Sequence, residues 1–460
     1  MESGFVDRKS ELAFLESLGS SNQPKLVLVY GRRRVGKTAL LQELAKRKGG
    51  LYLLARQESE KDQLKSFSNT MARHFNDETL ASSPLQNYDS IFTYLKQNIQ
   101  PGIPVILDEF PYMVEAQPAL PSIMQDHWDN HFQKTRSFFI LCGSSMRMME
   151  KLAGYKSPIY GRRTEQLLLG PLTFFDALEL MNSSPKEKAV EYYSVVGGTP
   201  AYLQLMDYSK TLEQNVVDRL LPKTAFLNQD AMFILREELD EPRNYFSILK
   251  SLAKGNTRLG HIINDTGLER GLVAKYLSVL QDLHVVQRAV PIGEKHETRS
   301  RKGLYAVSDP YFRFWFAFVF DNAQYTEDLG GQKTFRTRIA PLLDAHVGRI
   351  FEEIALEFMK TKTPWGKNYR MGRWWQDEQE IDIAGWDETG SDALLMEVKW
   401  SKLDEKKAYA ELDRLEKKAD AFTKGKPKQP RLKLGIIAKK IEGKERLRKA
   451  GFLAYDLDDF

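Results

Sequence analysis

The stretch KLVLVYGRRRVGKTALLQELAKR, residues 25–47, indicates the fold of the N-terminal part of the chain. It reads as a buried strand, a glycine-bounded loop and a helix with apolar residues at helical spacing. Gly31 and Gly36 bracket the loop, and Lys37 and Thr38 complete a GxxxxGK-Ser/Thr pattern. Glycines let backbone N–H groups wrap phosphates, the lysine neutralises the outer phosphates and the threonine hydroxyl ligates Mg²⁺. The sequence therefore predicts a nucleotide cradle, and the alternative is a merely basic turn.

The residues that we expect to contact the nucleotide from this loop are Gly31, Arg32, Arg33, Arg34, Val35, Gly36, Lys37, Thr38 and Ala39.

Composition limits the classes of protein and partner. A chain of 460 residues is expected to form three or four units rather than one core. Its 67 Lys and Arg against 62 Asp and Glu give +5, so a polyanion partner must be argued from local patches. The one cysteine, Cys142, excludes a disulfide framework and a multi-cysteine zinc site. Without an apolar leader or a run of about 18 apolar residues, we expect a cytoplasmic protein that does not enter a membrane.

Two later strands are expected to end beside the same loop. IPVILDEF, residues 103–110, delivers Asp108 and Glu109, of which the first can hold Mg²⁺ through water and the second can polarise the attacking water. SFFILCGSSMRMM, residues 137–149, delivers Ser144, whose hydroxyl can sense the terminal phosphate. The alternatives are an acid pair that caps a helix and a serine that begins one.

These motifs, with SPIYGRRTEQLLLGPL (157–172) and GGTPAYL (197–203), resemble the archaeal-type P-loop ATPases of the AAA+/STAND class over nearly the whole chain. The resemblance implies an α/β fold with a helical lid, and ATP and Mg²⁺ as cofactors. It also implies an arginine near the γ-phosphate of the same or a neighbouring chain, for which Arg162 and Arg163 are the candidates, and a lid contact at Pro200. The two arginines can equally be surface charges.

Three helices and two strands are predicted between Asn244 and Phe320. The helices are YFSILKSLA, RLGHIINDTGL and ERGLVAKYLSVLQDL, the last two joined around Gly267 as in a helix-turn-helix. HVVQRAVPI and KGLYAVSD read as strands, with the loop GEKHETRSRK between them. This order predicts a winged helix.

Cations of the third helix and of the loop suit phosphate contacts on duplex DNA. The candidates are Arg270, Lys275, Lys295, Arg299, Arg301 and Lys302. The alternatives are a docking lid and a merely solvated loop.

The stretch EIDIAGWDETGSDALLMEVKW, residues 380–400, predicts an antiparallel hairpin. With the turn near Gly390, residues whose numbers sum to 779 lie opposite, which sets Asp382 against Glu397 and Glu380 against Lys399. Two carboxylates facing each other across a ladder repel, so a cation is expected between them.

A divalent ion fits that expectation. Asp382, Glu397 and the Val398 carbonyl offer the hard oxygen ligands that Mg²⁺ prefers, and Lys399 can activate a hydrolytic water. Glu352, on the predicted helix HVGRIFEEIALEFMK, leans toward the core, where an unpaired carboxylate is costly, and is expected to approach the site through water.

The order of these elements resembles the PD-(D/E)XK nuclease fold, a restriction-endonuclease-like α/β domain, although Ile381 rather than a PD dipeptide precedes Asp382. The alternative is a solvated hairpin with a Glu380–Lys399 surface pair.

The expected domains are a P-loop core at 1–172, a helical lid at 173–235, a winged helix at 236–320, a connection at 321–342 and a nuclease-like domain at 343–460. Our hypothesis is an ATPase that binds DNA and controls its Mg²⁺-dependent cleavage. The alternatives are a nucleotide-gated module that binds DNA or protein without cutting, and a scaffold that oligomerises on ATP.

Overall fold

The structure is a computed structural model that describes residues 8–460 except 182–183, 240, 295 and 425–429. It divides into two units, Met1–Leu172 with Thr199–Ala201, and Thr173–Gly198 with Tyr202–Phe460. Within the described ranges, no helix combines the length and the apolar character that crossing a membrane requires.

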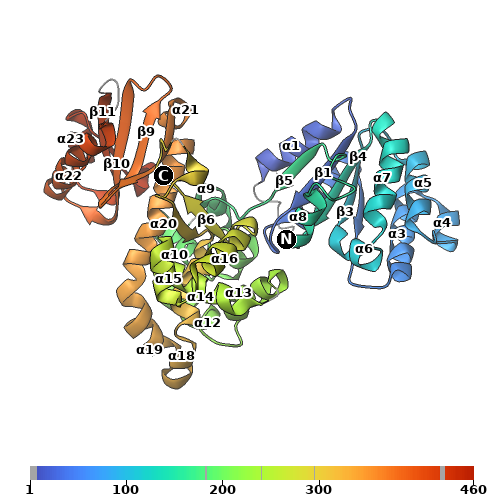
Figure 1. Ribbon diagram of the computed structural model, residues 1–460, viewed down its shortest axis with the longest axis horizontal. Coiled ribbons are helices and arrows are strands. Elements are labelled where there is room, and N and C mark those ends of the chain that lie inside the picture. Colours follow the sequence, from blue (N-terminus) through green and yellow to red (C-terminus); the bar gives the residue numbers. More distant parts are fainter. Residues whose placement is uncertain (1–7, 182–183, 240, 295, 425–429) are drawn as a thin grey trace. The chain divides into compact units, whose positions relative to one another are not determined.

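The first unit is built on five parallel strands in the order β2-β3-β4-β1-β5 (Figure 1). The strands are β1 (Lys25–Tyr30), β2 (Leu51–Leu54), β3 (Pro104–Asp108), β4 (Phe138–Gly143) and β5 (Glu165–Leu168). The central strands β1, β3 and β4 are almost wholly buried, as expected of a parallel sheet covered on both faces. Because all five strands run the same way, their carboxyl ends share one edge.

Helices cover both faces of this sheet. The first unit contains α1 (Lys9–Gly19), α2 (Lys37–Lys48), α3 (Glu60–Phe75), α4 (Glu78–Ser82), α5 (Tyr88–Asn98), α6 (Phe110–Ala116), α7 (Leu120–Asn130) and α8 (Met146–Ala153). Leu15 of α1 and Leu41 of α2 share one buried cluster with Ile140 of β4. Rings of α5 and α7 reach the other face, where Phe92 and Trp128 each lie 6.5 Å from the Phe139 ring centroid.

The second unit begins with helices and one short ladder. The helices are α9 (Phe174–Ala177), α10 (Lys186–Val196), α11 (Pro200–Leu205), α12 (Leu212–Arg219), α13 (Phe226–Glu238), α14 (Pro242–Ala253), α15 (Leu259–Thr266), α16 (Arg270–Asp282), α17 (Pro310–Phe314), α18 (Ala323–Leu329) and α19 (Gly331–Thr334). The first two residues of α11 belong to the first unit. Strands β6 (Val286–Ala289) and β7 (Leu304–Val307) pair antiparallel directly after α16. The three helices and two strands predicted between residues 244 and 309 are therefore present in that order.

A second sheet follows the long helix α20 (Ala340–Thr361) and the short α21 (Trp365–Asn368). Its strand order is β12-β11-β10-β9-β8. The elements are β8 (Tyr369–Gln376), β9 (Gln379–Asp387), β10 (Asp392–Leu403), α22 (Glu405–Thr423), β11 (Arg431–Ile441), α23 (Lys444–Lys449) and β12 (Leu453–Asp456). The helices α20 and α22 cover its two faces: Phe358 of α20 contacts Tyr455, whereas the adjacent Ala454 belongs to the cluster that α22 builds.

The predicted hairpin register is confirmed for four pairs, from Ala393 opposite Trp386 to Met396 opposite Ile383, all of which sum to 779. The ladder ends there. Gly372 pairs with Ala384 and Trp374 with Ile381, so two β9 residues, Asp382 and Ile383, oppose one residue of β8. This is a β-bulge, and bulges re-aim side chains.

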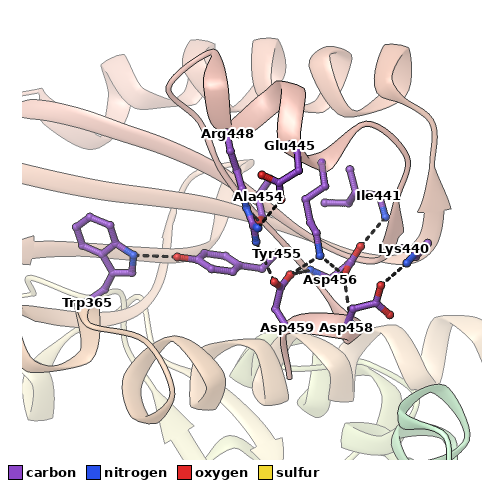
Figure 2. Close-up of polar contacts among 11 residues, drawn as sticks. Trp365, Lys440, Ile441, Glu445, Arg448, Ala454, Tyr455, Asp456, Asp458 and Asp459 are labelled. Carbon is purple, nitrogen blue, oxygen red and sulfur yellow. Dashed lines mark hydrogen bonds and ion pairs between the residues drawn. The ribbon is translucent and has the colours of Figure 1, made fainter.

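Charged side chains pair with one another around β12 and the end of β11, as Figure 2 shows. The fully buried Asp456 accepts hydrogen bonds from the Ile441 amide at 3.1 Å and from Lys444 Nζ at 2.7 Å. Asp459 accepts from Lys444 at 2.8 Å and from Arg448 at 2.9 Å. Each carboxylate oxygen of Asp456 and Asp459 has a cationic or amide donor, so the charges stabilise this end rather than forming an open site.

Candidate functional site

The phosphate loop lies between β1 and α2. A Cβ built at Gly31 would stand 2.1 Å from the Leu169 carbonyl oxygen, so only glycine fits there. Gly36 has φ +97°, a conformation that favours glycine. Lys37 Nζ donates to the carbonyls of Gly31 at 2.8 Å and Arg32 at 3.0 Å, and burial lowers its pKa. A buried ammonium held by its own loop is a strong attractor for phosphate.

Asp108, at the end of β3, accepts hydrogen bonds from several groups, one of which is the buried Cys142 thiol. Thr38 Oγ1 lies 3.0 Å from Asp108 Oδ2, and the Tyr52 hydroxyl donates to the same oxygen. The Glu109 amide donates to Oδ1 at 2.9 Å. The structure thus brings Thr38 and Asp108 together, and their oxygens are the hard ligands that suit Mg²⁺ directly or through water. Tyr52 was not predicted from the sequence.

Glu109 and Ser144 meet at the same edge. Glu109 has φ +53°, in the left-handed region, which turns the chain sharply between β3 and α6. Its Oε2 accepts from the Ser144 amide at 3.1 Å and from Ser144 Oγ at 2.9 Å. The carboxylate of Glu109 is therefore held at the ends of β3 and β4, close to the groups that would bind the phosphates.

Other predicted nucleotide contacts fall near the loop. A Cβ built at Gly36 would lie 3.9 Å from Pro200 Cγ, so Pro200 adjoins the loop. Arg33 donates to the Tyr112 hydroxyl at 2.9 Å, and Arg34 has φ +69°. Arg32 is half-buried, Val35 is buried and Ala39 is exposed at the start of α2.

The structure does not bring Arg162 to the nucleotide loop of its own chain, which corrects one of the two placements expected for it. Glu165 pairs with Val27 in parallel register, so the residues before β5 lie at the amino ends of the strands, opposite the phosphate edge. There Arg162 binds Asp129 through two bonds of 3.0 and 2.7 Å. Arg163 Cζ stands 5.4 Å from the centroid of the Tyr160 ring.

A second charged cluster lies on β9 and β10. Asp382 lies at the β-bulge, and its Oδ2 accepts from the Val398 amide of β10 at 2.7 Å. The buried Glu397 contacts two ammonium groups, Lys399 at 2.6 Å and Lys418 at 2.9 Å. Lys418 comes from α22 and was not predicted.

Glu352 adjoins this cluster from α20. Its Oε2 lies 3.4 Å from Arg373, which also pairs with Glu380. Burial, and then the charge of Asp382, raise the pKa of Glu352 to about 8, while Arg373 opposes the shift. Burial and the nearby Glu397 raise the pKa of Asp382 to about 6. These carboxylates are therefore crowded and only partly neutralised.

The charge balance of this cluster differs from the predicted one. Two lysines neutralise Glu397 where a divalent ion was expected, and Glu380 pairs with Arg373 rather than with Lys399. Among the described residues, no three His, Cys, Asp or Glu side chains converge closely enough to hold a metal ion. A metal here would rely on Asp382, Glu397 and the Val398 carbonyl, and would compete with Lys399 and Lys418.

The loop between β6 and β7 packs against β8 and β9, which the expectation of a free DNA-binding wing did not include. The Ile292 amide donates to the Arg373 carbonyl at 2.9 Å, and Trp375 Nε1 donates to the Lys302 carbonyl at 3.0 Å. A Cβ built at Gly293 would stand 2.7 Å from the Trp386 ring. Backbone and apolar contacts, together with an ion pair between Glu297 of the loop and Arg370 of β8, hold the loop against this sheet.

Four of the predicted DNA contacts are exposed: Arg270, Lys275, Arg301 and Lys302, of which Lys302 also pairs with Glu294 at 3.4 Å. Lys295 and the side chain of Arg299 lie outside the described residues.

Comparison with known proteins agrees with the first site. Residues 5–206 match a family described as an ATPase domain predominantly from Archaea, and residues 315–410 match one described as archaeal and bacterial proteins of unknown function. The Walker-type ATPase PABY2304 of Pyrococcus abyssi has a TM-score of 0.50 at 19% identity over 68% of this chain and 96% of its own, which shows a shared fold.

Two proteins of Methanocaldococcus jannaschii are similar in sequence. The "Uncharacterized ATP-binding protein MJ0423" is 50% identical over 44 residues, 10% of this chain and 75% of its own. The "Uncharacterized protein MJECL04" is 33% identical over 99% of this chain and 100% of its own. The chain therefore belongs to the family of MJECL04, and its first part is an ATPase domain of the kind found predominantly in Archaea.

Proposed function

We propose that the first unit hydrolyses ATP with Mg²⁺. The observation that carries the proposal is the meeting of Lys37, Thr38, Asp108 and Glu109 at one sheet edge. Mg²⁺ would neutralise the developing phosphate charge, held by Thr38 and, through water, by Asp108. Lys37 would bind the outer phosphates. Glu109 would orient the attacking water, with Ser144 holding its carboxylate.

Glu109→Gln tests this assignment. The substitution keeps the shape but removes the base, so hydrolysis should fall by about 10²-fold or more while nucleotide affinity stays within about 2-fold. The exposed Glu115→Gln on the same helix is the control. Unchanged turnover in Glu109→Gln would remove this residue from the reaction.

The arginine contact is proposed to act in trans, because Arg162 and Arg163 precede β5 at the edge opposite the phosphate loop. This requires an ATP-dependent oligomer. Mixing Lys37→Ala chains with Arg162→Ala, Arg163→Ala chains should then restore hydrolysis in mixed assemblies, because one interface would combine an intact loop with intact arginines. No restoration, with hydrolysis lost in each variant alone, would contradict trans action.

A second candidate function is Mg²⁺-dependent cleavage of DNA by a PD-(D/E)XK-like domain. The supporting observation is that Asp382, Glu397 and Lys399 lie together with Glu352 beside them. Crowded carboxylates with raised pKa values favour binding of a cation. The exposed Arg270 and Lys275 of a winged-helix fold would contribute phosphate contacts. The competing possibility is a domain that grips DNA without cutting, because lysines already neutralise Glu397.

Incubation of linear, branched and single-stranded DNA with Mg²⁺ separates these two possibilities. Cleavage should be lost in Asp382→Asn and kept in Asp413→Asn, an exposed position on α22. Binding without any metal-dependent cleavage would leave the gripping domain, and neither binding nor cleavage would remove DNA as the partner.

A further inference from the structure

Tyr52 joins the hydrophobic core to the proposed magnesium edge. Its ring packs against the buried cluster that contains Leu41, Leu44 and Ile106. Its hydroxyl leaves this core and donates to Asp108 Oδ2, the oxygen that also accepts from Thr38. The partner strand β3 fixes this reach, because Tyr52 pairs with Ile106, two residues before Asp108.

We propose that Tyr52 is a positioning residue for the ATPase site, acting through Asp108 on the affinity for Mg²⁺; this rests on the proposed function. A carboxylate at the end of a strand rotates about two bonds, and each fixed donor removes part of that freedom. Thr38 is exposed at the loop, so a ligand there can move it, and the Glu109 amide holds only Oδ1. The position of the Tyr52 hydroxyl is set by the core rather than by the nucleotide loop, and the buried Cys142 thiol of β4 also hydrogen-bonds to Asp108.

The hydroxyl of Tyr52 donates to a carboxylate oxygen at the proposed magnesium edge. Partners that orient metal ligands typically change metal affinity by about 10- to 100-fold when they are removed.

Tyr52→Phe removes the hydroxyl and keeps the packed ring. The Mg²⁺ concentration for half-maximal ATP hydrolysis should rise by about 10-fold, and saturating Mg²⁺ should restore most of the rate. Tyr94→Phe is the matched control, because Tyr94 also donates to an aspartate, Asp77 Oδ2 at 2.7 Å, on the surface of the same unit. That variant should leave the Mg²⁺ requirement unchanged.

A second readout does not depend on hydrolysis. In EDTA, the native chain and Tyr52→Phe should bind a fluorescent ADP analogue with equal affinity. With Mg²⁺ added, the variant should need about a 10-fold higher Mg²⁺ concentration to reach the same gain in affinity. The proposal is overturned if the two chains respond to Mg²⁺ identically, or if Tyr52→Phe weakens binding equally with and without Mg²⁺, as a merely structural role would. A native chain that binds the analogue with Mg²⁺ but hydrolyses no ATP would refute the proposed turnover and leave this test intact.

Discussion

The two acidic sites of this chain stabilise a buried carboxylate in different ways. At the phosphate edge, Asp108 accepts from two hydroxyl groups and an amide, and the nearby Lys37 is held by carbonyls. On the C-terminal sheet, Glu397 is paired with two ammonium groups, Lys399 and Lys418. Neutral donors orient a carboxylate and leave its charge for a ligand, whereas cations cancel it.

The two carboxylates differ in whether their present partners are neutral or cationic, and this affects how readily each would bind a metal ion. Asp108 is held by the neutral donors Thr38, Tyr52 and the Glu109 amide, so a metal would add to the arrangement rather than displace a cation from these contacts. At Glu397 a metal must displace lysines that already stabilise the fold. The first site thus keeps the carboxylate charge that the proposed Mg²⁺ would use, whereas at the second site two lysines already pair with Glu397.

The largest expected effect comes from removing both lysines at Glu397. Lys399→Met with Lys418→Met leaves a buried carboxylate uncompensated and should lower the free energy of unfolding by about 3 to 5 kcal/mol. Adding Glu397→Gln to this double variant should recover most of the loss. Chemical denaturation followed by tryptophan fluorescence measures both.

The response of the double variant to Mg²⁺ tests whether the lysines occupy the place of a metal ion. If the freed carboxylates can hold the ion, Mg²⁺ should raise the melting temperature of the double variant and not that of the triple variant. Stability that hardly changes on loss of both lysines would show that they do not balance the cluster.

A pH effect of intermediate size is expected from Glu352. Its pKa of about 8 in the folded chain exceeds the model-compound value of 4.5, so the folded state binds the proton more tightly. This stabilisation is complete below pH 4.5 and is lost as pH rises through 8, which amounts to about 3 kcal/mol between pH 5 and 8. In EDTA, Glu352→Gln should flatten the decline. An identical slope in the variant would contradict the assigned burial.

The smallest effect concerns the loop between β6 and β7. Gly293→Ala places a methyl group 2.7 Å from Trp386 and should destabilise the docked loop by about 1 to 2 kcal/mol. Gly330→Ala is the control, since its φ of +82° is close to the +85° of Gly293 but nothing lies within 4 Å. Trypsin should cleave after Arg301 faster in Gly293→Ala alone, and equal cleavage in both variants would refute the docking.

The phosphate edge was predictable because its chemistry is local in the sequence. The loop and Lys37 are contiguous, and parallel strands carry Asp108 and Ser144 to the same edge by topology. Tyr52 escaped prediction because a tyrosine in a short strand is usually only a packing residue. Its role emerges from the pairing of β2 with β3, which the sequence does not state.

The C-terminal site was predictable only in outline. The turn set the hairpin register, but the sequence did not indicate the bulge at Asp382 or the bond from the Val398 amide to its carboxylate. Arg373 and Lys418 come from β8 and α22, and neither the hairpin nor its spacing reveals which distant cation lies beside a given acid. Docking was one of the alternatives left open beside a DNA-binding wing, but the sequence does not state which surface the loop contacts, namely β8 and β9.

The most direct test of the central claim measures Mg²⁺-dependent ATP hydrolysis by the native chain, Lys37→Ala and Glu397→Gln together. We predict turnover by the native chain, a loss of about 10³-fold in Lys37→Ala and turnover within about 2-fold of native in Glu397→Gln. Hydrolysis that persists in Lys37→Ala, or that is absent from the native chain, would contradict the assignment of the phosphate edge as the catalytic site.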